Sequence, residues 1–162
     1  MKCAVIMGSK SDLPIAKKCV EVLESLGVGY TVRVMSAHRT PNEVREFALS
    51  AKDQGFGVII AIAGMAAHLA GVLAAYTRLP VIGVPAGGGT LGGVDALLST
   101  AQMPPGVPVA CVGVNAGGNA AYLAARILAL SDEGLAARLE CEALSMAEKV
   151  RVQDLEVRNE LP

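Results

Sequence analysis

Short apolar runs alternate along this chain with longer segments in which apolar residues recur every three or four positions. The runs predict strands at 3–7, 30–35, 57–62, 80–84 and 107–112. The segments between and after them predict helices at 12–26, 40–54, 66–77, 92–102 and 118–130. Such alternation is typical of a parallel sheet with helices on both faces and right-handed crossovers. We therefore expect one α/β domain over residues 1–162.

Two of these helices begin at recognisable capping sequences. Asp12 is a candidate N-cap with Pro14 in the first turn, and Gly27 follows the last turn. Thr40-Pro41-Asn42-Glu43 has the sequence of a capping box with proline at the first helical position. These signals place the start of each helix directly after a strand and its loop.

A long amphipathic segment, 132–158, follows the last predicted helix of the α/β unit. Its apolar residues recur at helical spacing with charges between them: Leu135, Leu139, Ala143, Met146, Ala147 and Val150. Packing of this helix on its own domain is one explanation. Because the helix is long for so small a domain, and the Ala-rich helices carry little charge, we expect contacts between copies in a homo-oligomer.

Composition excludes several classes of partner. The 162 residues suffice for one domain, the net charge is −1 without a basic run, and aromatic residues make up only 3%. We therefore expect no nucleic acid and no anionic membrane surface as partner. No charged residue lies between Asp53 and Arg78, a length that would span a bilayer. Its β-branched first part predicts a strand buried on both faces, and its Ala-rich second part a helix, so we expect no membrane span.

The cysteines and histidines indicate a reducing compartment and no metal site. Four cysteines are scattered without Cys-x-x-Cys spacing, and no short apolar core of a signal peptide is evident at the start. We expect a cytoplasmic protein whose cysteines act as small apolar residues. Two histidines, with no cysteine pair or acidic cluster, predict no metal ion.

Small, polar or glycine-rich segments follow every predicted strand, where open parallel sheets bind ligands. Gly8-Ser9-Lys10-Ser11-Asp12 follows the first strand and opens a helix, so its N–H groups and hydroxyls are typical of a phosphate site. Arg39, after the second strand, would add a charged fork, and Asp12 would accept from a ribose diol. The alternative is that Ser11 or Asp12 is simply an N-cap.

Both histidines lie in such segments. His38 lies in Ser36-Ala37-His38-Arg39-Thr40-Pro41, and its functional use would be as a general acid or base near neutral pH. His68 lies in Ala66-Ala67-His68-Leu69. The alternatives are a surface loop histidine for His38 and a buried structural one for His68. Their shared placement after strands favours an enzyme that transfers protons.

Other motifs are absent or misplaced. The chain has no Gly-x-Ser-x-Gly elbow and no phosphate-binding Gly-x-x-x-x-Gly-Lys sequence. The segment from Gly87 to Gly92 has dinucleotide-type glycine spacing, but it follows the fourth strand and no acidic residue lies about 20 positions further on. We interpret it as a flexible turn.

Together the motifs resemble one family, the class I PurE enzymes, which are 5-(carboxyamino)imidazole ribonucleotide mutases. The matching segments run in order over about residues 3–130: Gly8-Ser9-Lys10-Ser11-Asp12, Ser36-Ala37-His38-Arg39-Thr40-Pro41, Ala66-Ala67-His68-Leu69, Leu79-Pro80-Val81-Ile82-Gly83-Val84-Pro85, Asp95-Ala96-Leu97-Leu98-Ser99, Gln102-Met103-Pro104 and Asn119-Ala120-Ala121. The resemblance implies a flavodoxin-like three-layer α/β/α sandwich with a five-stranded parallel sheet. It also implies a homo-octamer, no cofactor, and reversible movement of a carboxyl group from the exocyclic amine to C4 of an aminoimidazole ribonucleotide.

The resemblance assigns a role to each site residue. Ser9, Ser11, Ser36 and Arg39 would bind the phosphate, Asp12 the ribose, and His38 would be the acid and base. Ala37, Ala63, Gly64, Ala66, His68 and Leu69 would contact the rest of the substrate, with His68 orienting the carboxylate.

The chain departs from the family pattern at three places. Met65 stands where the family usually has glycine, Ala70 where it has proline, and the segment after Pro85 has lost its larger residues. Class II relatives, which carboxylate aminoimidazole ribonucleotide directly, have lysine where this chain has Arg39. The alternatives are therefore direct carboxylation, a PurE-like carboxylase of a pyridine mononucleotide, and a flavodoxin-like protein that only binds a nucleotide or flavin.

Overall fold

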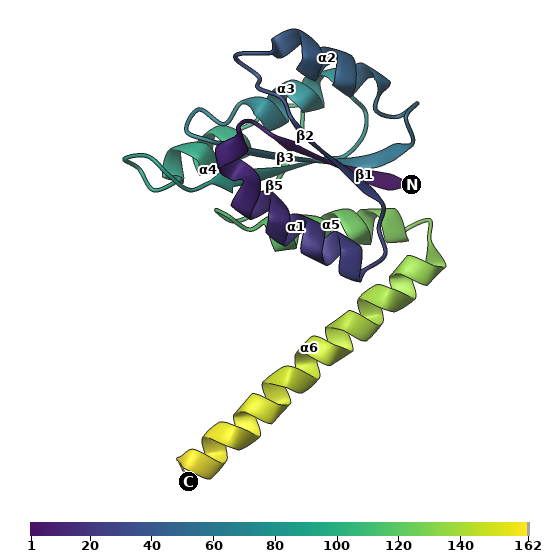
Figure 1. The fold of residues 1–162 in the computed structure, drawn as a ribbon, viewed down its shortest axis with the longest axis vertical. Helices are drawn as coiled ribbons and strands as arrows, with labels where there is room; N and C mark the ends of the chain where they lie inside the picture. Colours follow the sequence, from purple (N-terminus) through teal and green to yellow (C-terminus); the bar gives the residue numbers. More distant parts are fainter. Residues whose placement is uncertain (162) are drawn as a thin grey trace.

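Five parallel strands form one sheet in the order β2-β1-β3-β4-β5 (Figure 1). The computed structural model describes residues 1–161. The strands are β1 (Lys2–Met7), β2 (Tyr30–Val34), β3 (Phe56–Gly64), β4 (Val81–Ala86) and β5 (Ala110–Cys111). This strand order is that of flavodoxin-like folds, so the predicted fold class is confirmed.

Among residues 1–161, six α-helices and one short 3₁₀ helix connect and follow the strands. They are η1 (Lys10–Asp12), α1 (Leu13–Ser25), α2 (Pro41–Ser50), α3 (Leu69–Tyr76), α4 (Val94–Ala101), α5 (Gly117–Ala129) and α6 (Glu133–Glu160). All the helices predicted from the periodicity are present. The first four are shorter than predicted by two to five residues, and α5 has the predicted length but begins and ends one residue earlier.

Helices cover both faces of the sheet, and alternate strand residues point to opposite faces. Cys3 and Val5 of β1 join one core, which α1 and α5 cover, while Ala4 and Ile6 join the other, which α2 and α3 cover (Figure 1). Strands buried on both faces require continuous apolar sequence, which explains the uncharged stretch before Arg78. Within residues 1–161, no helix is long and apolar enough to cross a membrane.

Parallel pairing brings the carboxyl ends of the strands to one edge of the sheet. Met7, at the end of β1, is paired with both Val34 and Ile62, and Gly64 at the end of β3 is paired with Ala86. The loops that follow these four strands therefore begin side by side. This edge positions the candidate site.

The last strand is much shorter than the predicted 107–112. Only Ala110 and Cys111 pair with β4. Pro108 has no N–H to donate to a ladder, and the N–H of Val107 is used in a turn to the carbonyl of Pro104 at 3.3 Å. The apolar run predicted a longer strand, but Val107 and Pro108 have no backbone N–H free to pair with β4.

Asp12 and Thr40 occupy the predicted N-cap positions of α1 and α2, but neither side chain makes a cap bond. The Asp12 carboxylate instead takes part in the capping box of η1, whose N-cap is Ser9. The Thr40 hydroxyl accepts from the N–H of Ser36 at 2.9 Å and so closes the loop that precedes α2.

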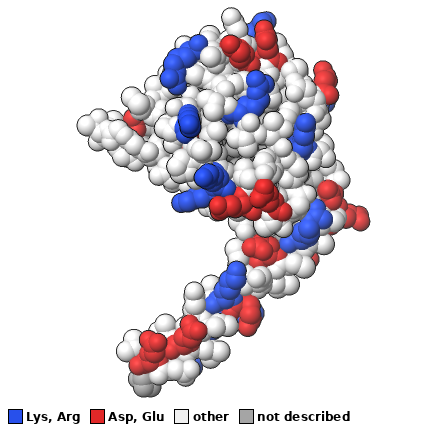
Figure 2. All heavy atoms as spheres, viewed as in Figure 1, with Lys and Arg blue, Asp and Glu red and all other residues white. Residues whose placement is uncertain are grey.

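The C-terminal helix is attached to the body only by its first turns. Leu135 is buried and Leu139 packs on the core under α1 and α5, while Leu144 and Val150 are exposed. From there α6 extends away from the sheet, and charges of both signs lie along it (Figures 1 and 2). Packing on its own domain therefore accounts only for the start of this helix.

The close packing of α4 on the sheet predicts that Gly83 cannot gain a side chain. An added Cβ would collide with Thr100 and lie 3.0 Å from Val109 and 3.3 Å from Ala70. We expect Gly83→Ala to lower the free energy of unfolding by about 1–3 kcal/mol, as overpacked cores do. Urea unfolding at fixed protein concentration measures this change.

Gly118→Ala is the matched control, because its Cβ would lie in ordinary contact, 3.7 Å from Val22, inside α5. Its free energy of unfolding should be unchanged or higher by up to about 1 kcal/mol. Equal losses in the two variants would mean that packing of α4 over β4 is not what Gly83 provides.

Candidate active site

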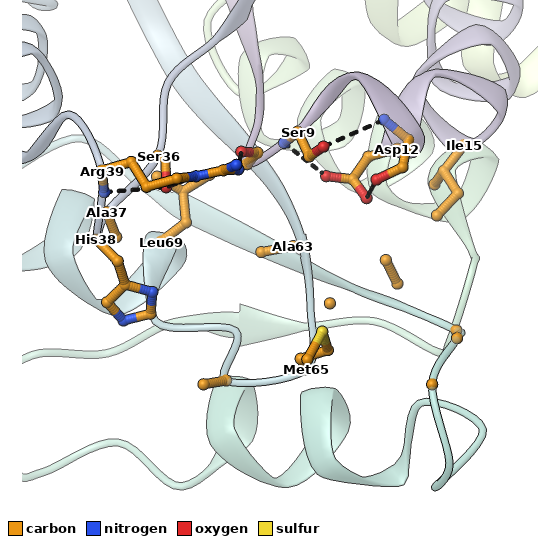
Figure 3. Close-up of a pocket in the computed structure, with 18 residues that line it drawn as sticks. Ser9, Asp12, Ile15, Ser36, Ala37, His38, Arg39, Ala63, Met65 and Leu69 are labelled. Carbon is orange, nitrogen blue, oxygen red and sulfur yellow. Dashed lines mark hydrogen bonds between the residues drawn. The ribbon is translucent and has the colours of Figure 1, made fainter.

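A cavity of about 670 Å³ opens at the carboxyl edge of the sheet (Figure 3). Its lining residues come from the loops after β1 to β4 and the adjoining helices: Gly8, Ser9, Ser11, Asp12, Ile15, Ser36, Ala37, His38, Arg39, Ala63, Gly64, Met65, Ala66, Leu69, Ala86, Gly87, Gly88 and Gly89. Every predicted site residue except His68 lies in this lining. Segments that are far apart in the sequence thus form one site.

The loop after β1 turns its polar groups toward one another. The Asp12 carboxylate accepts from the N–H of Ser9 at 3.0 Å and from the hydroxyl of Ser11 at 3.5 Å. Burial raises the pKa of Asp12, while hydrogen bonds from Ser9, Ser11 and Gly8 favour the charged form and oppose that rise. Asp12 is a buried acceptor at the cavity wall, which suits the hydroxyl groups of a ligand.

Arg39 extends from the loop after β2 toward the loop after β1. Its Nη2 donates to the carbonyl of Gly8 at 3.1 Å, and its Nε donates to the hydroxyl of Ser36 at 3.3 Å. Within residues 1–161, the ion pairs are confined to α6, so no carboxylate neutralises this guanidinium. A guanidinium without a carboxylate partner, beside serine hydroxyls, suits the binding of an anion.

The two histidines are in direct contact. His38 Nε2 lies 2.9 Å from His68 Nδ1, and the rings meet edge to face with their centroids 5.0 Å apart. When both rings are neutral, one of these nitrogens donates and the other accepts, so the tautomer of each ring depends on the other. His38 lines the cavity, on the opposite side of the view from Asp12 in Figure 3, and His68 contacts it from outside the lining.

The glycine segment after β4 forms part of the cavity wall. The N–H of Gly87 donates to the Asn115 side chain at 2.7 Å, and Gly93 packs so closely on Gly87 that an added Cβ would lie 2.9 Å from its Cα. The sequence analysis interprets Gly87 to Gly89 as part of a flexible turn and does not assign them to the site, nor Ile15, Met65 and Ala86. The position of the glycine segment after a parallel strand is the signal that could have placed it there.

Met65 has a conformation that favours glycine. Its φ is 56°, in the left-handed region, and its side chain is exposed at the cavity. Left-handed backbone is strained for a residue with a Cβ. The turn between β3 and α3, which carries His68, therefore begins with a strained residue.

Comparisons with known proteins agree with one another. A sequence model described as AIR carboxylase matches residues 2–149. An N5-carboxyaminoimidazole ribonucleotide mutase of Methanocaldococcus jannaschii is 53% identical over 154 residues, which are 95% of this chain and 96% of that protein. The mutase of the same name from Pyrococcus abyssi is 55% identical over 129 residues, 80% of this chain and 74% of that protein. The crystal structure of Treponema denticola PurE superposes with a TM-score of 0.85 at 30% identity, covering 95% of this chain and 96% of that one.

The strain at Met65 gives a testable difference between substitutions. We expect Met65→Val to lower the free energy of unfolding by about 1–2 kcal/mol, because a β-branched residue tolerates positive φ least. Met65→Gly should leave it unchanged, since relief of strain of about 1 kcal/mol is offset by the greater freedom of glycine in the unfolded chain. Urea unfolding midpoints measure both.

Met146→Val, on the exposed face of α6, is the control, and its loss should stay near the helix propensity difference of about 0.5 kcal/mol. A Met65→Gly variant as unstable as Met65→Val would show that side-chain contacts, not backbone strain, decide stability at this position.

Proposed function

The chain belongs to the AIR carboxylase family, and from that membership we propose that it interconverts 5-(carboxyamino)imidazole ribonucleotide and 4-carboxy-5-aminoimidazole ribonucleotide. The chain is an enzyme, and its curated relatives at about half identity carry the mutase name. The observation that supports this reaction best is the cavity itself, in which Arg39 and the serine hydroxyls line the same space as His38, the histidine that His68 contacts from outside.

The polar side of the cavity suits a ribose phosphate. We assign the phosphate to Arg39 and to the hydroxyls of Ser9, Ser11 and Ser36. The guanidinium of Arg39 already donates to the Gly8 carbonyl and to the Ser36 hydroxyl, and the Ser11 hydroxyl donates to the Asp12 carboxylate. A phosphate would replace the Gly8 carbonyl as partner of the guanidinium and form stronger, charge-assisted bonds. Asp12 would accept from the ribose hydroxyls.

The apolar side suits the aminoimidazole and its carboxyl group. Ala37, Ala63, Gly64, Ala66 and Leu69 leave room for a flat ring beside His38. Because small apolar walls exclude water, carbon dioxide released from the exocyclic nitrogen would stay next to C4. Because the cavity keeps the carbon dioxide beside the ring, the reaction needs no covalent carrier of the carboxyl group.

His38 moves the single proton that the reaction requires. As the bond between the exocyclic nitrogen and the carboxyl carbon breaks, protonated His38 gives a proton to that nitrogen. C4 of the enamine-like ring then attacks the carbon dioxide, and His38 removes the proton from C4 as the new carbon–carbon bond forms. His38 ends in its starting state, as a general acid and base should. Because His68 contacts His38 and does not line the cavity, we assign it to the orientation of His38 and not to the carboxylate, the role that the family resemblance implies.

Direct carboxylation of aminoimidazole ribonucleotide is the second candidate, because the family is described as carboxylases. That reaction uses the same attack of C4 on carbon dioxide and the same removal of a proton. Arg39 beside His38, where class II relatives have lysine, favours the mutase.

We also propose that the protein is a homo-octamer in the cytoplasm. Asp95 is the only Lys, Arg, Asp or Glu between Arg78 and Arg126, and one of its carboxylate oxygens is buried without a hydrogen-bond partner among residues 1–161. Leu91 and Leu98 beside it are exposed. An uncharged surface of this kind, together with the extended α6, supports burial between copies. The free state of all four cysteines supports a reducing compartment.

A substrate-choice assay tests the reaction. One arm supplies the carboxyamino nucleotide without bicarbonate, and the other supplies aminoimidazole ribonucleotide with abundant bicarbonate. We expect fast turnover in the first arm only, and a loss in kcat of about 10²–10⁴ in His38→Asn, because one acid–base group is removed.

Arg33→Gln is the control, since Arg33 is exposed on the edge strand β2 and does not line the cavity. Turnover in the second arm alone would replace the mutase by the direct carboxylase. Turnover in neither arm would reduce the protein to a nucleotide-binding domain.

A further inference from the structure

We propose that Ser99, on α4, is a positioning residue that holds His68 in contact with His38; this inference rests on the function proposed above. The Ser99 hydroxyl accepts a hydrogen bond from the N–H of Ala67 at 3.0 Å. Ala67 immediately precedes His68 and is 1% exposed. The contact joins α4 to the turn between β3 and α3, which is 32 residues away in the chain.

The hydroxyl is oriented by its own helix. Its nearest carbonyl acceptor is that of Asp95, one turn earlier in α4, at 2.9 Å, while the carbonyl of Met65 is 3.4 Å away. Because a hydroxyl has a single hydrogen, a bond to Asp95 leaves its lone pairs for the N–H of Ala67. Ser99 therefore acts as an acceptor aimed at this turn.

The turn has little else to hold it. Within residues 1–161, Ser99 is the one side chain that hydrogen-bonds to the backbone of residues 65–67. The turn begins with Met65 in the left-handed region, so it tends to relax when a constraint is lost. Without Ser99 the buried N–H of Ala67 would lack a partner, which typically destabilises a protein by about 1–3 kcal/mol.

The consequence falls on the histidine pair. A shift of the turn would move His68 as well. Because His38 Nε2 and His68 Nδ1 are 2.9 Å apart, a displacement of about 1 Å would take them beyond hydrogen-bond distance. A misplaced His68 would leave His38 free to rotate or to take the other tautomer. Arg39 and Ser36, which we assign to the phosphate, belong to another loop and would be unaffected.

Kinetics and hydrogen exchange of Ser99 variants test the proposal. For Ser99→Ala we expect kcat to fall by about 10–100-fold with a much smaller change in KM, as a displacement of about 1 Å in an active site does. Ser99→Thr should restore kcat to within a few fold, because threonine keeps a hydroxyl that bonds the preceding turn of its helix. Ser99→Cys, a weaker acceptor, should lie between them. In parallel, amide exchange of a peptide containing residues 65–68 should be faster in Ser99→Ala.

Ser25→Ala is the matched control, because the Ser25 hydroxyl also bonds a carbonyl of its own helix, that of Val22 at 2.9 Å, but holds no loop. It should match the parent protein in kcat and in exchange at residues 65–68. Unchanged exchange in Ser99→Ala would overturn the holding contact, and faster exchange with unchanged kcat would overturn its link to His38.

If the parent protein is inactive on both nucleotides, the proposed function fails. The role of Ser99 is then tested separately, by crystal structures of the Ser99 variants. A His38 Nε2 to His68 Nδ1 separation beyond hydrogen-bond distance in Ser99→Ala, restored in Ser99→Thr, would support it. An unchanged separation would overturn it. Should Ser99→Ala not fold, the same comparison between Ser99→Cys and Ser99→Thr applies.

Discussion

The parallel pairing of β1 with both β2 and β3 is the constraint on which the site depends. It places Met7 and Val34, the last residues of β1 and β2, side by side with Ile62 near the end of β3, so that the loops carrying Asp12, Arg39 and His68 begin next to one another. An antiparallel neighbour would send one of these loops to the opposite edge of the sheet. The contact between His38 and His68, which lie 30 residues apart, is a direct result of this pairing.

The chemistry of the cavity follows from how few charges it contains. Arg39 carries the positive charge near the loop after β1, Asp12 supplies a buried acceptor, and much of the remaining wall is alanine or glycine. Fixed donors in an apolar space interact more strongly than they would in water. A phosphate that binds to Arg39 would place the rest of a ribonucleotide along the cavity toward His38, where a proton must be transferred.

Much of the fold could be predicted from the sequence because burial on both faces leaves a strong local signal. Val58 to Ile62 form an uninterrupted apolar run, and this run is a central strand. The loops after the strands, and nearly all predicted site residues, followed from the rule that such sheets bind ligands at their carboxyl edge. The sequence did not predict side-chain contacts with residues distant in the chain, or which of several nearby groups a polar side chain would bond. Thr40 closes a loop instead of capping α2, Asp12 bonds back to Ser9, and the contact of His68 with His38 has no local signature.

The orientation of the nucleotide in the cavity is decided by a crystal structure with aminoimidazole ribonucleotide bound. We expect phosphate oxygens within hydrogen-bond distance of Arg39 and Ser36, ribose hydroxyls at Asp12, and the imidazole ring beside His38. A phosphate bound at Gly87 to Gly89, with the ring turned away from His38, would contradict this orientation.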